Sequence, residues 1–133
     1  MKILIGISTL FIIEMMAEQL GASQVKAEIN QKDNCDNPLT QTTMNICANL
    51  DYQEADARLN EIYQQVKREI VNDVQEQKLI KVQLSWIEFR DLNCNYIADA
   101  YRGGSIQPLI YYSCLTSLTE ERIQHLELMV DNF

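Results

Sequence analysis

The chain has 133 residues, of which 11 are Lys or Arg and 19 are Asp or Glu, so its formal net charge is −8. This acidity argues against nucleic acid as a partner, because phosphate backbones repel negative charge. With 47% apolar residues, 4 Gly and 2 Pro, the composition is typical of one packed domain, and long stretches free of Gly and Pro favour helices over a many-stranded sandwich. The single histidine, His125, leaves little material for zinc sites or histidine-dependent catalysis. We therefore expect an all-α fold with no metal, no other cofactor and no enzymatic activity.

The N-terminus has the organisation of a secretory signal peptide. Met1 and Lys2 form a short basic start, and the run from Ile3 to Ile13 is apolar and uncharged. A helix over that run spans only roughly 16 Å, about half of a bilayer's hydrocarbon thickness, which disfavours a membrane anchor. The small residues Gly21–Ser23 predict cleavage near Ser23, so residues 1–23 would leave and the protein would be periplasmic or secreted. An uncleaved amphipathic N-terminal helix is the alternative.

The chain contains four cysteines: Cys35, Cys47, Cys94 and Cys114. Their spacing matches neither a CxxC redox motif nor a zinc ribbon, so an exported chain should form two structural disulfides from them. Three pairings are possible. Because Gly103–Gly104 lies midway between Cys94 and Cys114, two helices that fold back there would bring these sulfurs level. We therefore favour Cys94 with Cys114 and Cys35 with Cys47 over the other two arrangements. The second pair requires the chain to double back near Pro38, because a single helix would hold its cysteines roughly 18 Å apart.

Two helices are predicted in the long stretch without Gly or Pro that follows the lead-in, residues 24–39. Thr40 to Arg102 is too long for one ordinary helix, and Asn72–Asp73 supplies a break. We expect Asn72 to end the first helix in the left-handed conformation, and Asp73 to cap the second with Glu76 completing a capping box. These signals place the helices at about 41–71 and 74–101.

A third helix is predicted to follow Gly103–Gly104, with Ser105 as its cap and Pro108 in its first turn. A bend or restart at residues 116–119 is left open. Apolar residues recur at three- and four-residue steps in all three helices, and the second helix is apolar on so broad a face that it needs partners on more than one side. The apolar stripe of that helix is expected to comprise Leu79, Val82, Trp86, Phe89 and Ile97. Residues 40–133 should therefore form a small antiparallel bundle of three main helices stapled by two disulfides.

An ordered set of short segments resembles the LprI-type lysozyme-inhibitor family of small exported bacterial proteins. The matching segments are Thr43–Ala48, Ala55–Asp56, Leu59–Asn60, Tyr63, Gln83, Trp86, Phe89–Asp91, Cys94, Gly103–Ser105, Cys114, Leu118–Thr119 and Arg122. The set extends over about Cys35 to Leu126. One departure is Thr43, where the family often has an acidic residue, so a capping-box carboxylate is missing. The resemblance implies a helical domain with two disulfides, and it names inhibition of lysozyme as an activity found in the family.

Several prominent residues have structural rather than catalytic interpretations. Trp86 lies on the apolar stripe of the second helix and is expected in the core. Arg90 and Asp91, adjacent on a helix, should point in different directions and pair with polar groups of neighbouring helices, such as Asp56 or Asn60. A lone histidine beside Leu126 is far more often a surface or packing residue than a catalytic base.

A cluster of aromatic and basic residues at the second turn is the favoured partner-binding surface. Its members are Tyr96, Tyr101, Arg102, Gly103, Gly104, Ser105, Tyr111 and Tyr112. Tyr and Arg are enriched among the residues that dominate binding energy, and a turn held by a disulfide presents them at little entropic cost. We therefore predict an exported, non-enzymatic protein that binds a cationic partner, with lysozyme as the partner that the resemblance supplies. A structural or chaperone-like envelope module without lysozyme activity is the alternative.

Overall fold

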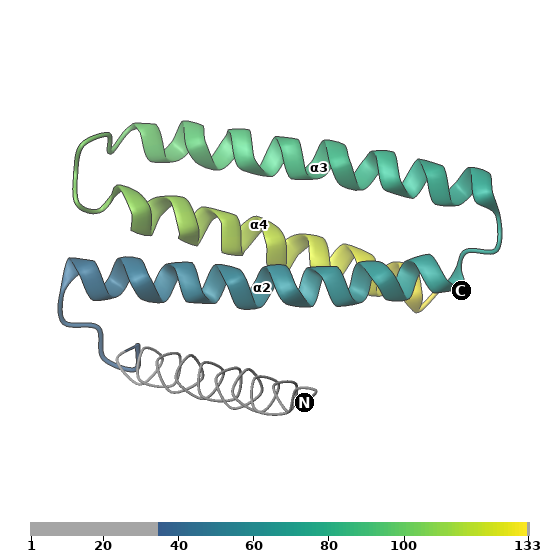
Figure 1. Ribbon diagram of the computed structural model, residues 1–133, viewed down its shortest axis with the longest axis horizontal. Helices are drawn as coiled ribbons and strands as arrows, with labels where there is room; N and C mark the ends of the chain where they lie inside the picture. Colours follow the sequence, from purple (N-terminus) through teal and green to yellow (C-terminus); the bar gives the residue numbers. More distant parts are fainter. Residues whose placement is uncertain (1–34, 133) are drawn as a thin grey trace, which may run out of the picture. The chain divides into compact units, whose positions relative to one another are not determined.

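The computed structural model describes residues 35–132 and has three long α-helices: α2 (Gln41–Glu69), α3 (Asp73–Asp99) and α4 (Gln107–Val130) (Figure 1). All three lie in one compact unit that begins at Pro38. Successive helices run in opposite directions, so the predicted all-α antiparallel bundle is confirmed. The predicted signal peptide, residues 1–23, and most of the lead-in lie outside the described residues. Within residues 35–132, no helix is long and apolar enough to cross a membrane.

Helix α2 begins with a cap formed by two threonines. The Thr40 side chain accepts a hydrogen bond from the Thr43 backbone N–H at 3.1 Å, and the two hydroxyls lie 2.8 Å apart. A Ser or Thr at the N-cap normally gains a second partner from an acidic residue three positions later. Here the Thr43 hydroxyl interacts with the cap instead, so the missing carboxylate does not prevent the helix from starting where expected.

The break between α2 and α3 differs from the predicted one. Asn72 has an extended backbone with φ −114° rather than a left-handed one, and its Oδ1 accepts hydrogen bonds from the N–H groups of Val74 and Gln75. Asn72 is therefore the N-cap of α3, and Asp73 is its first residue, where a carboxylate still benefits from the positive end of the helix dipole. Glu76 completes no capping box with Asp73, because its carboxylate pairs with Lys67 of α2 at 2.9 Å.

The turn between α3 and α4 depends on one glycine conformation. Gly103 has φ +79°, which other residues rarely adopt, whereas a Cβ on Gly104 would approach the Tyr101 carbonyl at 3.2 Å. Ser105 does not cap α4 as predicted: the cap position is Ile106, without a side-chain hydrogen bond, and the Ser105 carbonyl accepts one from Asn45 of α2.

Helix α4 carries the expected proline in its first turn and runs without interruption through residues 116–119. The Thr116 hydroxyl donates to the Tyr112 carbonyl one turn back, which satisfies the hydroxyl without breaking the helix. Helix α4 packs against both of the other helices, more extensively against α2 than against α3. The central apolar cluster comprises Leu59, Val66, Leu79, Ile123 and Leu126.

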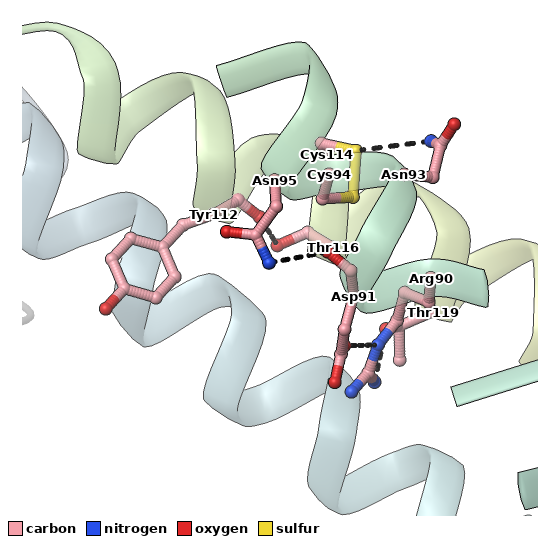
Figure 2. The surroundings of a disulfide bond; sticks show 9 residues. All are labelled: Arg90, Asp91, Asn93, Cys94, Asn95, Tyr112, Cys114, Thr116 and Thr119. Atoms are coloured by element: carbon pink, nitrogen blue, oxygen red, sulfur yellow. Dashed lines mark hydrogen bonds and ion pairs between the residues drawn. A yellow bond between two sulfur atoms is a disulfide. The ribbon is translucent and has the colours of Figure 1, made fainter. Parts of the chain in front are cut away.

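Both predicted disulfides are confirmed. Cys94 and Cys114 are joined with a Cα–Cα distance of 5.5 Å, which ties the last part of α3 to the first part of α4 (Figure 2). Cys35 pairs with Cys47, and no cysteine is free. The disulfide therefore closes the α3–α4 hairpin five residues before the end of α3 and seven residues after the start of α4.

The expected apolar stripe of α3 is only partly buried. Leu79 is buried and Trp86 packs against the central cluster, whereas Val82 and Phe89 are 52% and 56% exposed. Ile97 is also exposed, at 41%. The stripe is wider than the surface that α4 and α2 can cover, because each helix in a three-helix bundle contacts only two neighbours.

Candidate functional site

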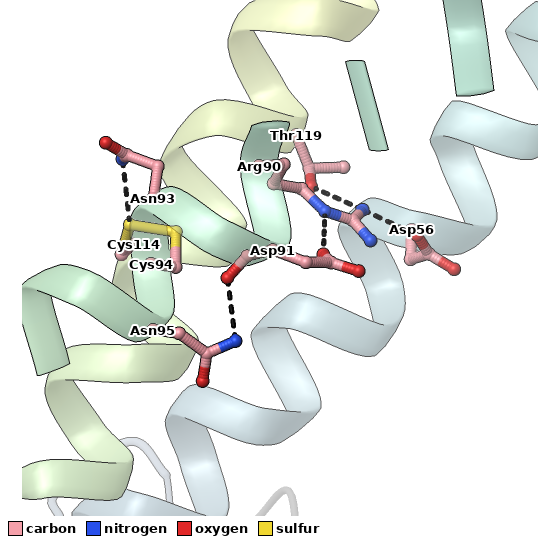
Figure 3. Close-up of polar contacts among 8 residues, drawn as sticks. All are labelled: Asp56, Arg90, Asp91, Asn93, Cys94, Asn95, Cys114 and Thr119. Atoms are coloured by element: carbon pink, nitrogen blue, oxygen red, sulfur yellow. Dashed lines mark hydrogen bonds and ion pairs between the residues drawn. A yellow bond between two sulfur atoms is a disulfide. The ribbon is translucent and has the colours of Figure 1, made fainter. Parts of the chain in front are cut away.

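A buried arginine joins the three helices near the middle of the bundle. The Arg90 side chain of α3 is 6% exposed, and its Nη1 donates to Asp56 of α2 at 3.1 Å and to the Thr119 hydroxyl of α4 at 3.4 Å (Figure 3). Its Nε donates to Asp91 at 2.9 Å. The predicted structural pairing of Arg90 with Asp56 is confirmed. The expectation that Arg90 and Asp91 point apart is wrong, because the long arginine chain folds back far enough for Nε to reach the neighbouring carboxylate.

Two aromatic rings complete the surroundings of the Arg90 guanidinium. Its central carbon lies 5.3 Å from the centre of the Tyr52 ring and 5.1 Å from that of the Trp86 ring. These distances are in the range of favourable cation–π contacts. Trp86 is partly buried against the central apolar cluster, and it also provides part of the environment that holds a charge in the interior.

A second buried arginine, Arg122 of α4, also lies next to the Trp86 ring. Its guanidinium carbon is 6.0 Å from the Trp86 ring centre, and its Nε donates to the Gln83 side chain of α3 at 3.0 Å. Arg122 and Gln83 are only 6% and 7% exposed, and Arg122 Nη2 has no hydrogen-bond partner among the described residues.

The two arginines differ in their electrostatic support. Burial, the largest single influence on Arg90, lowers its pKa, but the hydrogen bonds to Asp91 and Asp56 and the nearby negative charges outweigh it, so the pKa of Arg90 lies above its ordinary value. Burial also lowers the pKa of Arg122, and there no carboxylate compensates. Burial raises the pKa of the Tyr52 hydroxyl, and the positive charge of Arg90 opposes that rise.

This cluster, which we call the Arg90 network, comprises Tyr52, Asp56, Gln83, Trp86, Arg90, Asp91, Thr119 and Arg122. It joins α2, α3 and α4 through charge-assisted hydrogen bonds, which fix the register of the helices. Guanidinium groups stay protonated at physiological pH and cannot act as a general acid or base. The Arg90 network is therefore structural rather than catalytic. Among the described residues, no group of three His, Cys, Asp or Glu side chains is arranged to hold a metal ion.

A groove of about 340 Å³ lies between α2 and α3, beside the Arg90 network. Its lining residues are Tyr52, Asp56, Leu59, Asn60, Tyr63, Gln64, Ile80, Gln83, Leu84, Ile87 and Arg90. The walls alternate between polar and apolar groups. Since Asp56 and Arg90 are engaged with each other, the charges at this groove are already paired.

The α3–α4 turn presents Tyr101 and Arg102 at its outer end. Tyr101 is 45% exposed, and the Arg102 side chain is 76% exposed while its Nε donates to Asp99 at 2.7 Å. The Gly103 N–H donates to the Gln107 side chain, and Asn45 holds the Ser105 carbonyl at 2.9 Å. These hydrogen bonds and the nearby disulfide hold the backbone of the turn in place. The side chains of Tyr101 and Arg102 remain accessible.

The other tyrosines of the predicted cluster lie elsewhere. Tyr112 stacks on Tyr52 of α2 with ring centres 6.2 Å apart, and Tyr111 meets Tyr112 edge-on at 5.3 Å. Both are half-buried, and burial raises the pKa of Tyr111. Tyr96 is 81% exposed on α3, away from these contacts. The structure therefore brings Tyr101, Arg102, Gly103, Gly104 and Ser105 together at the turn, while Tyr111 and Tyr112 are engaged in packing between helices.

Tyr52 carries no sequence signal for a role, and Gln83, Thr119 and Arg122 are marked by the family resemblance, which gives them no role. A signal for Gln83 was present, because a polar residue lies between Leu79 and Trp86 on an otherwise apolar face. Such a position indicates a buried polar group, but not which helix supplies its partner. His125 is exposed on α4, in agreement with the expected surface role.

Comparison with known proteins places this architecture in a family. The family model described as "Lysozyme inhibitor LprI" matches residues 33–126, which include the Arg90 network, the turn and all four cysteines. The chain is also similar to the uncharacterized protein R02472 of Rhizobium meliloti (strain 1021), with 32% identity over 110 residues that cover 74% of this chain and 79% of that protein. No solved structure matches. The match over most of a chain with the expected two disulfides shows that this protein belongs to the lysozyme inhibitor LprI family.

Proposed function

We propose that this protein is an exported inhibitor that binds lysozyme and occludes the cleft in which lysozyme holds its carbohydrate substrate. Membership of the LprI family carries the proposal, since the family is described by that activity. The signal-peptide organisation of residues 1–23 supports a location outside the cytoplasm, where lysozyme acts. Occlusion requires no catalytic group on the inhibitor. This agrees with the Arg90 network, in which the buried charge is engaged in contacts between the helices.

The acidic surface supports attraction to a basic lysozyme. Asp51, Glu54 and Glu61 are exposed on α2, and Glu121 and Glu127 are exposed on α4. Oppositely charged surfaces raise the rate of encounter between proteins, and salt weakens that effect by screening exposed charges. The same charges contribute less to the lifetime of the complex, so a separate set of contacts is needed to hold the partner.

We assign those contacts to the α3–α4 turn, with Tyr101 and Arg102 as the anchors. The turn is a convex end of the bundle, fixed by the Cys94–Cys114 disulfide and by the hydrogen bond from Asn45, and a preorganised surface loses little entropy on binding. Glycoside hydrolases hold two carboxyl groups across the cleft. An exposed guanidinium such as that of Arg102 complements such a cleft, whereas the acidic helices complement the basic surface around it.

The direct test is a lysis assay with peptidoglycan, a basic lysozyme and the exported protein. Wild type should inhibit, and Tyr101→Ala or Arg102→Ala should weaken inhibition roughly 5- to 150-fold, the range expected for anchors worth about 1 to 3 kcal/mol. Arg68→Ala, an exposed arginine near the far end of α2, is the matched control and should inhibit like wild type. Helical circular dichroism should be the same in all four proteins.

Two outcomes contradict parts of the proposal. If the Tyr101 and Arg102 variants inhibit like wild type while charge reversal at Glu54 and Glu61 abolishes binding, the contact lies on the acidic face of α2. If wild type inhibits no basic lysozyme at micromolar concentration, the inhibitor assignment itself fails.

A further inference from the structure

An exposed apolar stripe runs along the outer face of α3. Val82, Phe89, Leu92 and Tyr96 are 52%, 56%, 63% and 81% exposed, and none of them lines the groove between α2 and α3. Single exposed apolar side chains are ordinary, but four large ones on one face of one helix mark an interaction surface. We call these four residues the α3 stripe.

The spacing of the α3 stripe is that of a helix–helix seam. Val82, Phe89 and Tyr96 are seven residues apart and all apolar or aromatic, and Ser85, Leu92 and Asp99 form a second row with the same period, in which Leu92 is the apolar member. Two rows of this kind, offset by three and four residues, are the a and d positions through which one helix packs along another. The geometry therefore fits a helix as the partner better than a flat surface or a small ligand.

The charges on this face are arranged unequally along the helix. Lys78 and Lys81 are exposed before the stripe, Glu88 is exposed beside its middle, and Asp99 is exposed at its end. If two such helices pair in the same direction, like charges meet at both ends. If they pair in opposite directions, Lys81 of each helix lies beside Asp99 of the other, whose carboxylate also pairs with Arg102 of its own chain, and the apolar centre around Phe89 and Leu92 meets its own copy. The face is thus complementary to itself in the antiparallel arrangement.

We propose that the α3 stripe is a dimerisation surface, with a second copy of this chain as its occupant. An antiparallel pair of identical helices has a two-fold axis, so the interface is closed and uses the same residues on both sides. Two stripes of this size offer on the order of 1,000 Å² of contact, the lower end for specific interfaces, which predicts a weak, concentration-dependent dimer.

This arrangement leaves the α3–α4 turns free. The two-fold axis passes near Phe89 and Leu92, and Gly103 follows about 20 Å further along the helix direction in each copy. The two turns therefore lie about 40 Å apart, at opposite ends of the helix pair, so neither turn blocks the other. The two surfaces share one contact, because Asp99 at the end of the dimer face also pairs with Arg102 of the turn.

Sedimentation or light scattering of the exported protein, produced from the full chain, tests the surface directly. Wild type should pass from monomer to dimer as its concentration rises through the micromolar range, and Phe89→Glu should remain monomeric at the highest concentration. Leu84→Glu is the matched control, because Leu84 is 62% exposed on the same helix but lines the groove, and this variant should dimerise like wild type. A wild type that stays monomeric, or a Phe89→Glu protein that dimerises like wild type, overturns the proposal.

A charge-swap experiment tests the antiparallel orientation independently of the apolar contacts. Lys78→Glu/Lys81→Glu in one protein and Asp99→Lys in another should each weaken self-association several-fold, because both ends of each dimer then carry like charges. A mixture of the two proteins should form mixed dimers about as readily as wild type forms its own. If mixing restores nothing, the antiparallel arrangement is wrong. If the Phe89→Glu variant instead loses lysozyme inhibition while wild type is monomeric, the stripe is a lysozyme contact and the dimer is excluded.

Discussion

At the scale of single residues, the organising feature is a positive charge held inside an apolar bundle. Arg90 is almost fully buried, yet it contacts carboxylates on α2 and α3, a hydroxyl on α4 and two aromatic rings. Burying a charge costs stability unless hydrogen bonds replace those it made with water, and the bonds of Arg90 reach α2, α3 and α4. Such a residue specifies how the helices align, because a shift of α2 would remove the Asp56 contact and a shift of α4 would remove the Thr119 contact.

The first prediction concerns Arg90 and an exposed arginine as its control. Arg90→Ala removes the ion pairs to Asp56 and Asp91, which are 39% and 46% exposed and so partly rescued by water, and it empties the space beside Trp86. We expect a loss of about 2 to 4 kcal/mol in the free energy of unfolding. Arg58→Ala removes an exposed pair with Glu120 and should cost less than about 1 kcal/mol. Urea denaturation measures both, and equal losses would contradict the structural role of Arg90.

The second prediction concerns alkaline stability. The pKa of Tyr52 is raised in the folded protein, so above about pH 10 the unfolded chain releases this proton first. The stabilising contribution is therefore complete below pH 10 and is lost as the pH rises through the folded-state pKa. Tyr52→Phe should show a shallower fall in the free energy of unfolding between pH 9 and 11 than wild type, as measured by denaturant titrations at each pH. Parallel curves for the two proteins would contradict this assignment.

Residue patterns predicted part of this network. The pairing of Arg90 with Asp56 followed from two charges on helices expected to be neighbours, and the core position of Trp86 followed from periodicity. The contact of Arg122 with Gln83 did not follow, because these residues are 39 positions apart and their meeting depends on how α3 crosses α4. Pattern reasoning identifies a polar residue on an apolar face but leaves its partner undetermined.

At the scale of elements, each helix end depends on a few local hydrogen bonds. Existence and length of the helices were predicted well, because their apolar periodicity extends over several turns. The caps were predicted less well: Asn72 caps α3 instead of Asp73, and Ser105 holds Asn45 instead of capping α4. Neighbouring polar residues offer competing caps, and only the backbone path decides between them.

The third prediction separates the two candidate caps of α3. Asn72→Ala removes the acceptor for the N–H groups of Val74 and Gln75 and should cost about 1 kcal/mol of stability. Asp73→Ala should cost only about 0.3 to 0.5 kcal/mol, through the weaker interaction with the helix dipole. Thermal and urea unfolding of the two variants give the comparison. A larger loss for Asp73→Ala would restore the cap that the capping-box pattern predicted.

The fourth prediction concerns the disulfide between α3 and α4. Cys94 and Cys114 are 20 positions apart, so replacing both with Ala should lower the free energy of unfolding by about 3 kcal/mol through the greater entropy of the unfolded chain. The double variant should keep its helices at low denaturant, since the Arg90 network and the apolar cluster remain. A variant as stable as wild type would show that the bridge does not constrain the unfolded chain.

As a whole molecule, the protein is an acidic three-helix bundle whose α3–α4 turn is tied by a disulfide and whose interior holds one arginine paired with carboxylates and a second, Arg122, without them. The fold could be predicted nearly completely from the sequence, and the family from an ordered set of short segments. The residues of the proposed binding surface come together only in part: Tyr101 and Arg102 are exposed at the turn, whereas Tyr112 stacks on Tyr52 of α2 and Tyr111 packs against Tyr112. Aromatic residues serve packing and binding equally well, and burial in the folded protein decides between the two.

We propose that this protein blocks the substrate cleft of lysozyme, and a competition assay with a short soluble oligosaccharide distinguishes this mechanism from inhibition at any other site. The rate at which a small soluble substrate is hydrolysed depends on access to the cleft. It does not depend on whether lysozyme can reach an insoluble cell wall. We predict that the exported protein inhibits its hydrolysis by a basic lysozyme, and that inhibition weakens in proportion as the oligosaccharide concentration rises above its KM. Hydrolysis that continues unchanged at micromolar protein, or inhibition that the oligosaccharide cannot relieve, would contradict the account.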